Sequence, residues 1–148
     1  MADEGRGEID VPAPVADVWD VVCDMAEYPA WMGDVKHVAI QDTDDLGRPS
    51  VVEFRVGGFG VTVGYTLAYR YDHHRSVGWE LVRSNELRRM DGEYTFDEVG
   101  TAADPVTHVT YRLTVDLKIP VIGLVKRRAE RVVIHHALSG LRDRVASR

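Results

Sequence analysis

The side chains with the clearest capacity for ligand chemistry are four tyrosines in the middle of the chain, Tyr65, Tyr69, Tyr94 and Tyr111. Each stands in a segment where apolar and polar residues alternate, and each falls on the apolar side of that alternation. A buried phenol needs a hydrogen-bond partner, or its burial costs about 1 to 3 kcal/mol. Hydroxyls that converge over an apolar floor would suit a flat, oxygen-bearing ligand such as a quinone or polyketide. The alternative is that each tyrosine lies at a sheet margin with its hydroxyl in water.

Other apolar residues extend this predicted pocket. Phe54, Trp79 and Phe96 share the apolar faces of the same alternating segments. Trp31 and Met32 belong to the segment EYPAWMGDVKHV, which a proline prevents from being one long helix. We expect Trp31 and Met32 at the mouth of the pocket, where a side chain that seals the core can also gate the ligand.

Arg88 has the parity of Met90 and Tyr94, so it is predicted to point inward unless a bulge intervenes. A buried guanidinium needs an anionic or multiply accepting partner. It could bind a ligand carbonyl or phosphate, or polarise an enolisable ketone. The alternative is that Arg88 reaches solvent or pairs with a carboxylate such as Glu86.

Two histidine pairs raise the question of a metal site. His135 and His136 are neighbours in a predicted helix, where adjacent side chains diverge by about 100°, so both cannot readily bind one ion. His73 and His74 fall in a predicted hairpin turn. No metal site is therefore predicted. His136, beside Val132, remains a candidate inward residue, either as a pocket acid or base or as a core histidine.

Three further motifs are interpreted as structural. The stretch DTDDLGRPSVVE resembles a calcium loop in spacing, but Leu46 takes a ligand position and both flanks alternate like strands, so a hairpin turn is predicted. GGFG lacks the lysine and helix of a phosphate-binding loop and also predicts a hairpin. Cys23 has no histidine nearby in sequence and is expected to be a small core residue.

These side chains require a sheet with one apolar face and an element that covers it. Alternation with turn signals about every ten residues predicts antiparallel strands from residue 35 to 118. VADVWDVVCDMA has helical spacing, and a long helix of about 25 residues is predicted after Pro120. Its apolar stripe drifts around the axis, so part of the helix is expected to roof a void, with Val121, Leu124 and Val125 as lining residues. A bend in the helix or a dimer contact would explain the same drift.

The composition limits the classes of protein to which this chain can belong. The 148 residues suit a single domain, 1–148, and one cysteine excludes an internal disulfide. No apolar run reaches about 20 residues and the start lacks the order of a secretory signal, so no transmembrane segment and a cytoplasmic location are expected. Residues 119–148 hold 7 of the 18 Lys/Arg but only 2 of the 24 Asp/Glu. This uneven distribution of charge indicates a basic helix that lies across an acidic body. Because the basic residues are not interleaved with aromatic residues, no nucleic acid partner is expected.

The order of these elements resembles the START-like superfamily, in particular the bacterial polyketide cyclase/dehydrase and coenzyme Q-binding group. The likeness rests on VPAPVADVWDVVCDMAEYPAWMGDVKHV, GWELV, DGEYTFDEVG, THVTYRLTVDLKIP and IGLVKRRAERVVIHHALSGLRDRV. It implies an α+β helix-grip fold, in which a curved antiparallel sheet wraps around a long C-terminal helix and two short helices follow the first strand. His135 and His136 stand where similar proteins carry a small polar pair, so their role is not implied.

The resemblance implies a cavity that binds or carries a small hydrophobic molecule, such as a lipid, quinone or polyketide. The leading hypothesis is such a binding protein without a cofactor, as a monomer or homodimer. A second is a polyketide aromatase/cyclase, in which Arg88 and Tyr65 or Tyr111 polarise or protonate carbonyls of a substrate held in a reactive geometry. A third is a partner-binding module that resembles bacterial toxins of the superfamily and uses the basic helix.

Overall fold

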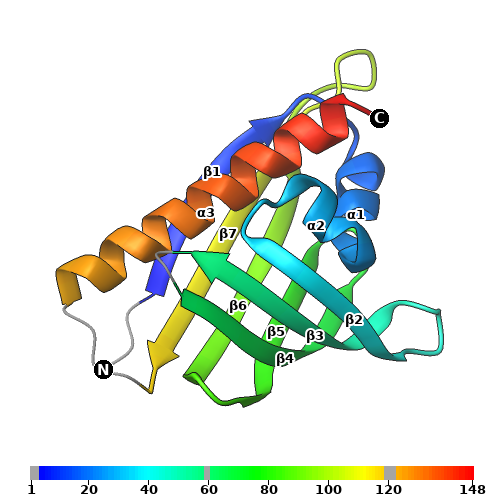
Figure 1. The fold of residues 1–148 in the computed structure, drawn as a ribbon. Helices are drawn as coiled ribbons and strands as arrows, with labels where there is room; N and C mark the ends of the chain where they lie inside the picture. The colour runs from blue at the N-terminus through cyan, green and yellow to red at the C-terminus, as the bar shows by residue number, and fades with distance from the viewer. Residues whose placement is uncertain (1–3, 59–60, 119–122) are drawn as a thin grey trace.

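The helix-grip architecture expected from the sequence is confirmed. A computed structural model describes residues 4–58, 61–118 and 123–148. At residues 58, 61 and 123–129 it describes the backbone and not the side chains. Strand β1 (Glu4–Val11) precedes α1 (Val15–Cys23), a 3₁₀ turn (Met25–Glu27) and α2 (Tyr28–Trp31), as Figure 1 shows. The remaining elements are β2 (Val35–Thr43), β3 (Pro49–Gly58), β4 (Val61–Asp72), β5 (Ser76–Ser84), β6 (Leu87–Glu98), β7 (Thr107–Leu117) and α3 (Gly123–Ala146).

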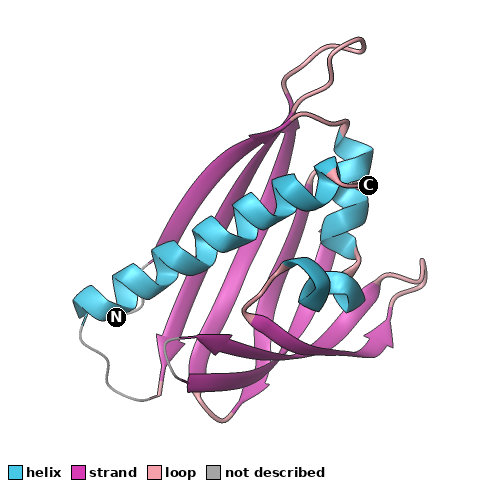
Figure 2. Cartoon of the chain, turned by 45° about the horizontal axis from the view of Figure 1, so that its top comes forward, coloured by secondary structure: helices cyan, strands magenta, loops and turns pink. Residues whose placement is uncertain are grey.

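The strands form one antiparallel sheet in the order β1-β7-β6-β5-β4-β3-β2. Because side chains alternate between the faces of a strand, the register decides which residues meet inside. It places Phe54 opposite Tyr65 and Tyr94 opposite Tyr111. Figure 2 shows the sheet curving around α3, with α1 and α2 at one end. None of the helices in the described ranges is long and apolar enough to cross a membrane.

Helix α3 packs mainly on β1 and β7 at one side of the sheet. Two glycines of β1 allow this close approach. A Cβ added at Gly7 would lie 2.5 Å from Cγ2 of Ile134, and one added at Gly5 would lie 2.8 Å from Cδ1 of the same residue. Beyond Ile134, the buried face of α3 continues with Leu138 and Leu141. The described part of the helix is therefore held mainly against β1.

The short helices close one end of the sheet. In α1 the buried residues are Val18, Trp19, Val21 and Val22, which matches the predicted amphipathic stripe. Helix α2 meets α3 where Trp31 lies against Gly140, since a Cβ at Gly140 would be 3.1 Å from Cε3 of Trp31. The turn between β2 and β3 is the predicted hairpin, closed by hydrogen bonds from the backbone N–H of Leu46 and Arg48 to Oδ1 of Asp44.

Candidate functional site

An aromatic wall lines the inner face of the sheet on β3 to β7. Its members are the seven residues predicted to point inward, which all belong to the core or pack against it: Phe54, Tyr65, Tyr69, Trp79, Tyr94, Phe96 and Tyr111. Trp79 lies at the centre of this aromatic wall. Its ring centroid is 6.0 Å from that of Tyr69, 5.5 Å from that of Tyr94 and 5.6 Å from that of Tyr111. The wall thus combines apolar ring surface with several polar groups.

The polar atoms of the aromatic wall make no hydrogen bond within the described part of the chain. Two other tyrosines are satisfied, because Tyr28 donates to the carbonyl of Val22 and Tyr71 donates to that of Pro49. By contrast, Nε1 of Trp79 is buried without an acceptor among the described residues, in a residue only 3% exposed. The phenols of Tyr65, Tyr69, Tyr94 and Tyr111 also make no hydrogen bond in the described ranges, but Nε1 of Trp79 is the only polar atom of the wall that is both fully buried and without a partner there.

Burial raises the pKa of all four wall phenols. Desolvation is the main cause for Tyr65, Tyr69, Tyr94 and Tyr111, because a charged phenolate loses more than the neutral phenol when water is removed. These phenols therefore stay protonated at neutral pH. They can donate hydrogen bonds to a carbonyl, but they are poor general bases.

The predicted mouth residues lie where α2, β2 and α3 approach one another. Trp31 and Met32 are half-buried and pack against the core. The ring of Trp31 contacts Tyr28 edge-on at a centroid distance of 5.3 Å, and Tyr28 stacks on Phe54 of the aromatic wall at 6.2 Å. This chain of contacts joins the mouth segment to the wall. Of the predicted helix residues, Val121 lies outside the described residues, and so do the side chains of Leu124 and Val125.

Arg88 does not point inward, which corrects the expectation from parity. Its side chain is 65% exposed, and Nη1 lies 3.6 Å from Oδ2 of Asp116. The pairing of β6 with β7 shifts register between Leu87 and Arg89, so the flanking Leu87 and Met90 are buried instead. A bulge of this kind interrupts the alternation on which the prediction depended.

His136 is also not an inward residue. Its side chain is 53% exposed, and Nδ1 lies 3.1 Å from Oδ2 of Asp34, in the turn before β2. The buried face of α3 instead contains Ile134, Ala137 and Leu138, so His136 falls on the opposite side of the helix. His135 is exposed as well. In the described part of the chain, no group of three His, Cys, Asp or Glu could hold a metal ion.

Cys23 is not placed for nucleophilic chemistry. It is half-buried at the end of α1, and burial raises its pKa to about 12. A thiol is nucleophilic as the thiolate, which is scarce at neutral pH when the pKa is so high. The structure therefore favours the core role expected from the sequence.

The comparisons with known proteins agree with this architecture. A family model described as polyketide cyclase/dehydrase and lipid transport matches residues 4–148. The chain belongs to this family. The family includes the group that the sequence resembles, so that resemblance is confirmed. No curated protein matches the sequence at a significant level.

Several solved structures share the fold of this polyketide cyclase/dehydrase family member. A START superfamily protein from Mycobacterium smegmatis is 20% identical, with a TM-score of 0.89 and 99% of each chain covered. The Zhui aromatase/cyclase from Streptomyces sp. R1128 is 15% identical, with a TM-score of 0.75 over 99% of this chain and 94% of that one. Ginseng major latex-like protein 151 from Panax ginseng is 12% identical, with a TM-score of 0.70 and coverage of 99% and 97%. At these identities the likeness establishes the fold alone.

The outer face of the sheet in this protein carries a histidine between two carboxylates. Nδ1 of His108 lies 2.6 Å from Oδ1 of Asp10, and Nε2 lies 3.2 Å from Oε1 of Glu8. The hydrogen bonds to Asp10 and Glu8 raise the pKa of His108, and the contact with His108 lowers the pKa of Glu8. This cluster ties β1 to β7 through a charge that depends on pH.

Replacing His108 with glutamine should lower the free energy of unfolding more at about pH 6 than at about pH 9. A histidine whose pKa is raised by folding stabilises the protein fully below its ordinary value of 6.5. That contribution is lost as the pH rises through the raised pKa of the folded state. Urea unfolding at both pH values measures the difference, with His37→Gln, an exposed residue of β2, as the control. A loss that does not decrease with pH would contradict this account.

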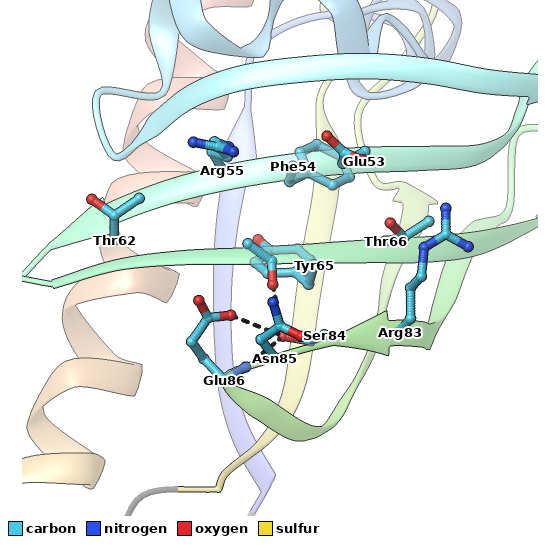
Figure 3. Close-up of a pocket in the computed structure, with 11 residues that line it drawn as sticks. Glu53, Phe54, Arg55, Thr62, Tyr65, Thr66, Arg83, Ser84, Asn85 and Glu86 are labelled. Carbon is cyan, nitrogen blue, oxygen red and sulfur yellow. Dashed lines mark hydrogen bonds between the residues drawn. The ribbon is translucent and has the colours of Figure 1, made fainter.

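Sequence reasoning missed two features of this family member. The unmatched indole N–H of Trp79 depends on neighbours from several strands, and a single-strand pattern does not contain them. The second feature is a hollow of about 480 Å³ on the outer face of β3, β4 and β5, shown in Figure 3. The outward parity of Glu53 and Arg55 was the only signal for it, because a hollow also needs the turn after β5 to fold over that face.

Proposed function

We propose that this protein binds or carries a small, neutral, oxygen-bearing hydrophobic molecule between the inner face of the sheet and α3. A lipid ester, a quinone or a polyketide would fit this chemical description. The single observation that carries the proposal is the buried indole N–H of Trp79 on the aromatic wall, which has no acceptor in the described part of the chain. The family description, polyketide cyclase/dehydrase and lipid transport, supports the same class of ligand.

The unmatched indole N–H indicates what the ligand must offer. An unsatisfied buried donor costs about 1 to 3 kcal/mol, so proteins rarely keep one without a use. A carbonyl or ether oxygen could accept from Nε1 of Trp79 and from a neighbouring phenol at once. The surrounding rings would cover the apolar remainder of the molecule, as in most small-molecule sites.

Two properties of Tyr65 and Tyr69 support a space beside the aromatic wall. Both residues retain partial solvent accessibility, yet desolvation raises the pKa of both phenols. These properties are compatible when the accessible surface faces a hollow enclosed by protein instead of bulk water. The position of α3 on β1 and β7 is consistent with such a space, since the main contacts of α3 that the structure describes are with β1, α1 and β7.

The charge of the interior favours a neutral ligand over an anion. Among the buried side chains that the structure describes, none belongs to lysine, arginine or histidine. A fatty acid would therefore lose the hydration of its carboxylate without gaining a cation, which is costly. An ester or ketone of the same chain length avoids that cost.

A cyclase activity remains the second candidate, favoured by the protonated state of the wall phenols. Tyr65 and Tyr111 could donate to a carbonyl of a bound polyketide, and the shared fold with an aromatase/cyclase supports that role. However, the guanidinium of Arg88 faces solvent and leaves that predicted catalytic set incomplete. Binding without chemistry is therefore the function that the site supports best.

Native mass spectrometry of the purified protein tests the proposal. We expect either a co-purified molecule that solvent extraction removes, or a one-to-one complex after addition of an apolar ketone or ester. Blocking the space should abolish the complex, and Leu67→Trp, a larger side chain on the inner face of β4, is the variant for that purpose. A protein that carries no apolar molecule and accepts none would contradict the proposal.

Replacing Trp31 with alanine should change ligand exchange more than stability. Trp31 is half-buried in the seam between α2 and α3, so its removal opens the seam while most of the core stays intact. We expect the ligand dissociation rate to rise about tenfold, since affinity changes within one site appear mainly in that rate. The loss of stability should be about 1 to 2 kcal/mol, below the cost of a fully buried tryptophan.

Stopped-flow dilution and urea unfolding measure the two effects of the Trp31 substitution. Trp31→Phe is the matched control, because it keeps an aromatic ring in the seam. A large loss of stability with an unchanged dissociation rate would show that Trp31 only seals the core and does not control ligand exchange.

A further inference from the structure

The hollow on the outer face of β3, β4 and β5 lies on the side of the sheet opposite to α3, as Figure 3 shows. Its volume of about 480 Å³ falls within the range of small-molecule sites. The lining combines charged and polar side chains with Phe54 and Tyr65, which also belong to the aromatic wall. It consists of Glu53, Phe54, Arg55, Thr62, Gly64, Tyr65, Thr66, Arg83, Ser84, Asn85 and Glu86.

A glycine and a hydrogen-bonded turn shape the hollow. Gly64 has no side chain, and a Cβ added there would meet no atom closer than the Phe54 carbonyl oxygen at 3.9 Å. Ser84 fastens the turn after β5 to this floor, because its hydroxyl donates to the carbonyl of Gly64 at 2.6 Å. The same hydroxyl accepts from the backbone N–H of Glu86 at 3.2 Å and of Leu87 at 3.0 Å. Glu86 is thereby held at the rim.

The floor of the hollow contains the hydroxyl of Thr66. Thr66 is 2% exposed, although it lies on the outer face between Glu53 and Arg83 in the strand register. Its side chain makes no hydrogen bond to any residue that the structure describes. The hydroxyl oxygen is not one of the fully buried atoms that lack a partner, so it keeps accessible surface where Thr66 lines the hollow. A threonine hydroxyl can donate one hydrogen bond and accept two, so it is available to a polar ligand atom there.

The rim carries two positive and two negative side chains that do not neutralise one another. Nη2 of Arg83 donates to Oε1 of Gln41 at 2.9 Å, and Nε2 of Gln41 donates to Oε2 of Glu53 at 3.1 Å. The amide thus separates that guanidinium from that carboxylate. Arg55 is exposed and forms no ion pair within the described ranges, and Glu86 contacts only the Ser84 hydroxyl at 3.4 Å.

We propose that this outer hollow binds a small zwitterion, a molecule that carries an ammonium and a carboxylate, such as a free amino acid or a short peptide. A carboxylate would accept charge-assisted hydrogen bonds from Arg55, and an ammonium would donate to Glu86 or Glu53. A simple anion or cation would meet two groups of its own sign. The charged rim does not suit the apolar molecule proposed for the interior, so the two proposals concern different ligands, although Phe54 and Tyr65 belong to both linings.

Nuclear magnetic resonance of the ¹⁵N-labelled protein tests the outer hollow directly. The probes are glycine, triglycine, sodium acetate and the uncharged N-acetyl-triglycine amide. We expect glycine or triglycine to shift the amide signals of Gly64, Thr66 and Glu86 in a saturable way, while acetate and the uncharged peptide shift them little. Glycine and triglycine distinguish a free amino acid from a peptide as the preferred occupant.

Two variants make this outcome specific to the hollow. Gly64→Val fills the floor without a backbone clash, so it should abolish the saturable shifts in a protein that remains folded by circular dichroism. Arg55→Gln should weaken binding about tenfold, the effect of losing one charge-assisted hydrogen bond. Arg70→Gln, on the outer face of β4 beyond the hollow, should leave affinity unchanged. Equal shifts with acetate, or full binding by Gly64→Val, would overturn the proposal.

Discussion

Replacement of Trp79 by phenylalanine should weaken binding of a carbonyl-bearing apolar ligand about tenfold while the unliganded protein keeps its stability. Nε1 of Trp79 has no acceptor in the described part of the chain, so in the free protein it contributes an unsatisfied donor. Phenylalanine removes that cost of about 1 to 3 kcal/mol but leaves a small cavity of comparable cost. We therefore expect the free energy of unfolding to change by less than about 1 kcal/mol.

Calorimetric titration and urea unfolding separate the two effects of Trp79→Phe. Trp19→Phe is the matched control, because Trp19 is equally buried but packs in α1 against Tyr71 and Phe96, at the closed end of the sheet. That control should lose stability and keep ligand affinity. If Trp79→Phe bound the ligand as tightly as the natural protein, the indole N–H would have no part in recognition.

Replacement of Gly92 by alanine should cost about 3 kcal/mol or more of stability. Gly92 pairs with Trp79 across β6 and β5, and the indole lies directly on its backbone. An added Cβ would lie 2.5 Å from the Arg112 carbonyl oxygen and 2.5 Å from Cζ2 of Trp79. The indole could move, but the carbonyl belongs to the neighbouring strand and cannot give way without a shift of β7. Ligand binding should fall with the displaced indole.

Gly64→Ala is the control for Gly92→Ala, since both glycines lie within strands of the same sheet. A Cβ at Gly64 meets nothing closer than 3.9 Å, so the stability of the Gly64→Ala variant should be unchanged or slightly raised. Thermal and urea unfolding of the two variants give the comparison. Similar stability of the two variants would show that the sheet can accommodate a side chain at Gly92, which would contradict this prediction.

The inner face of the sheet was predictable from the sequence because strand alternation is regular there. Tyr65, Tyr69 and Tyr94 were expected inward from their parity alone, and the pairing of β3 to β7 places them so. The predicted long helix also ends close to Ala146, and Arg144 lies 4.0 Å from Glu27 of the acidic body that it crosses. Local periodicity was sufficient for these features.

The errors arose where periodicity is interrupted or ambiguous. One register shift beside Arg88 turns its side chain to solvent, and nothing in the local pattern marks that shift. The drifting apolar stripe of α3 left several faces possible, and His136 is only two residues from the buried Ile134. Two further features depend on the register between strands, which alternation within one strand does not define. They are the contact of the Trp79 indole with the backbone of Gly92 and the outer hollow above Gly64.

The most direct test of a neutral interior ligand is a matched titration with methyl decanoate and decanoate at neutral pH, measured by equilibrium dialysis. The two molecules share one chain and differ in the charge at the oxygen end. Because no described buried side chain is cationic, we expect the ester to bind at least about tenfold more tightly than the ionised acid. Equal affinity, or tighter binding of the acid, would mean that a positive group meets the ligand and would contradict the account.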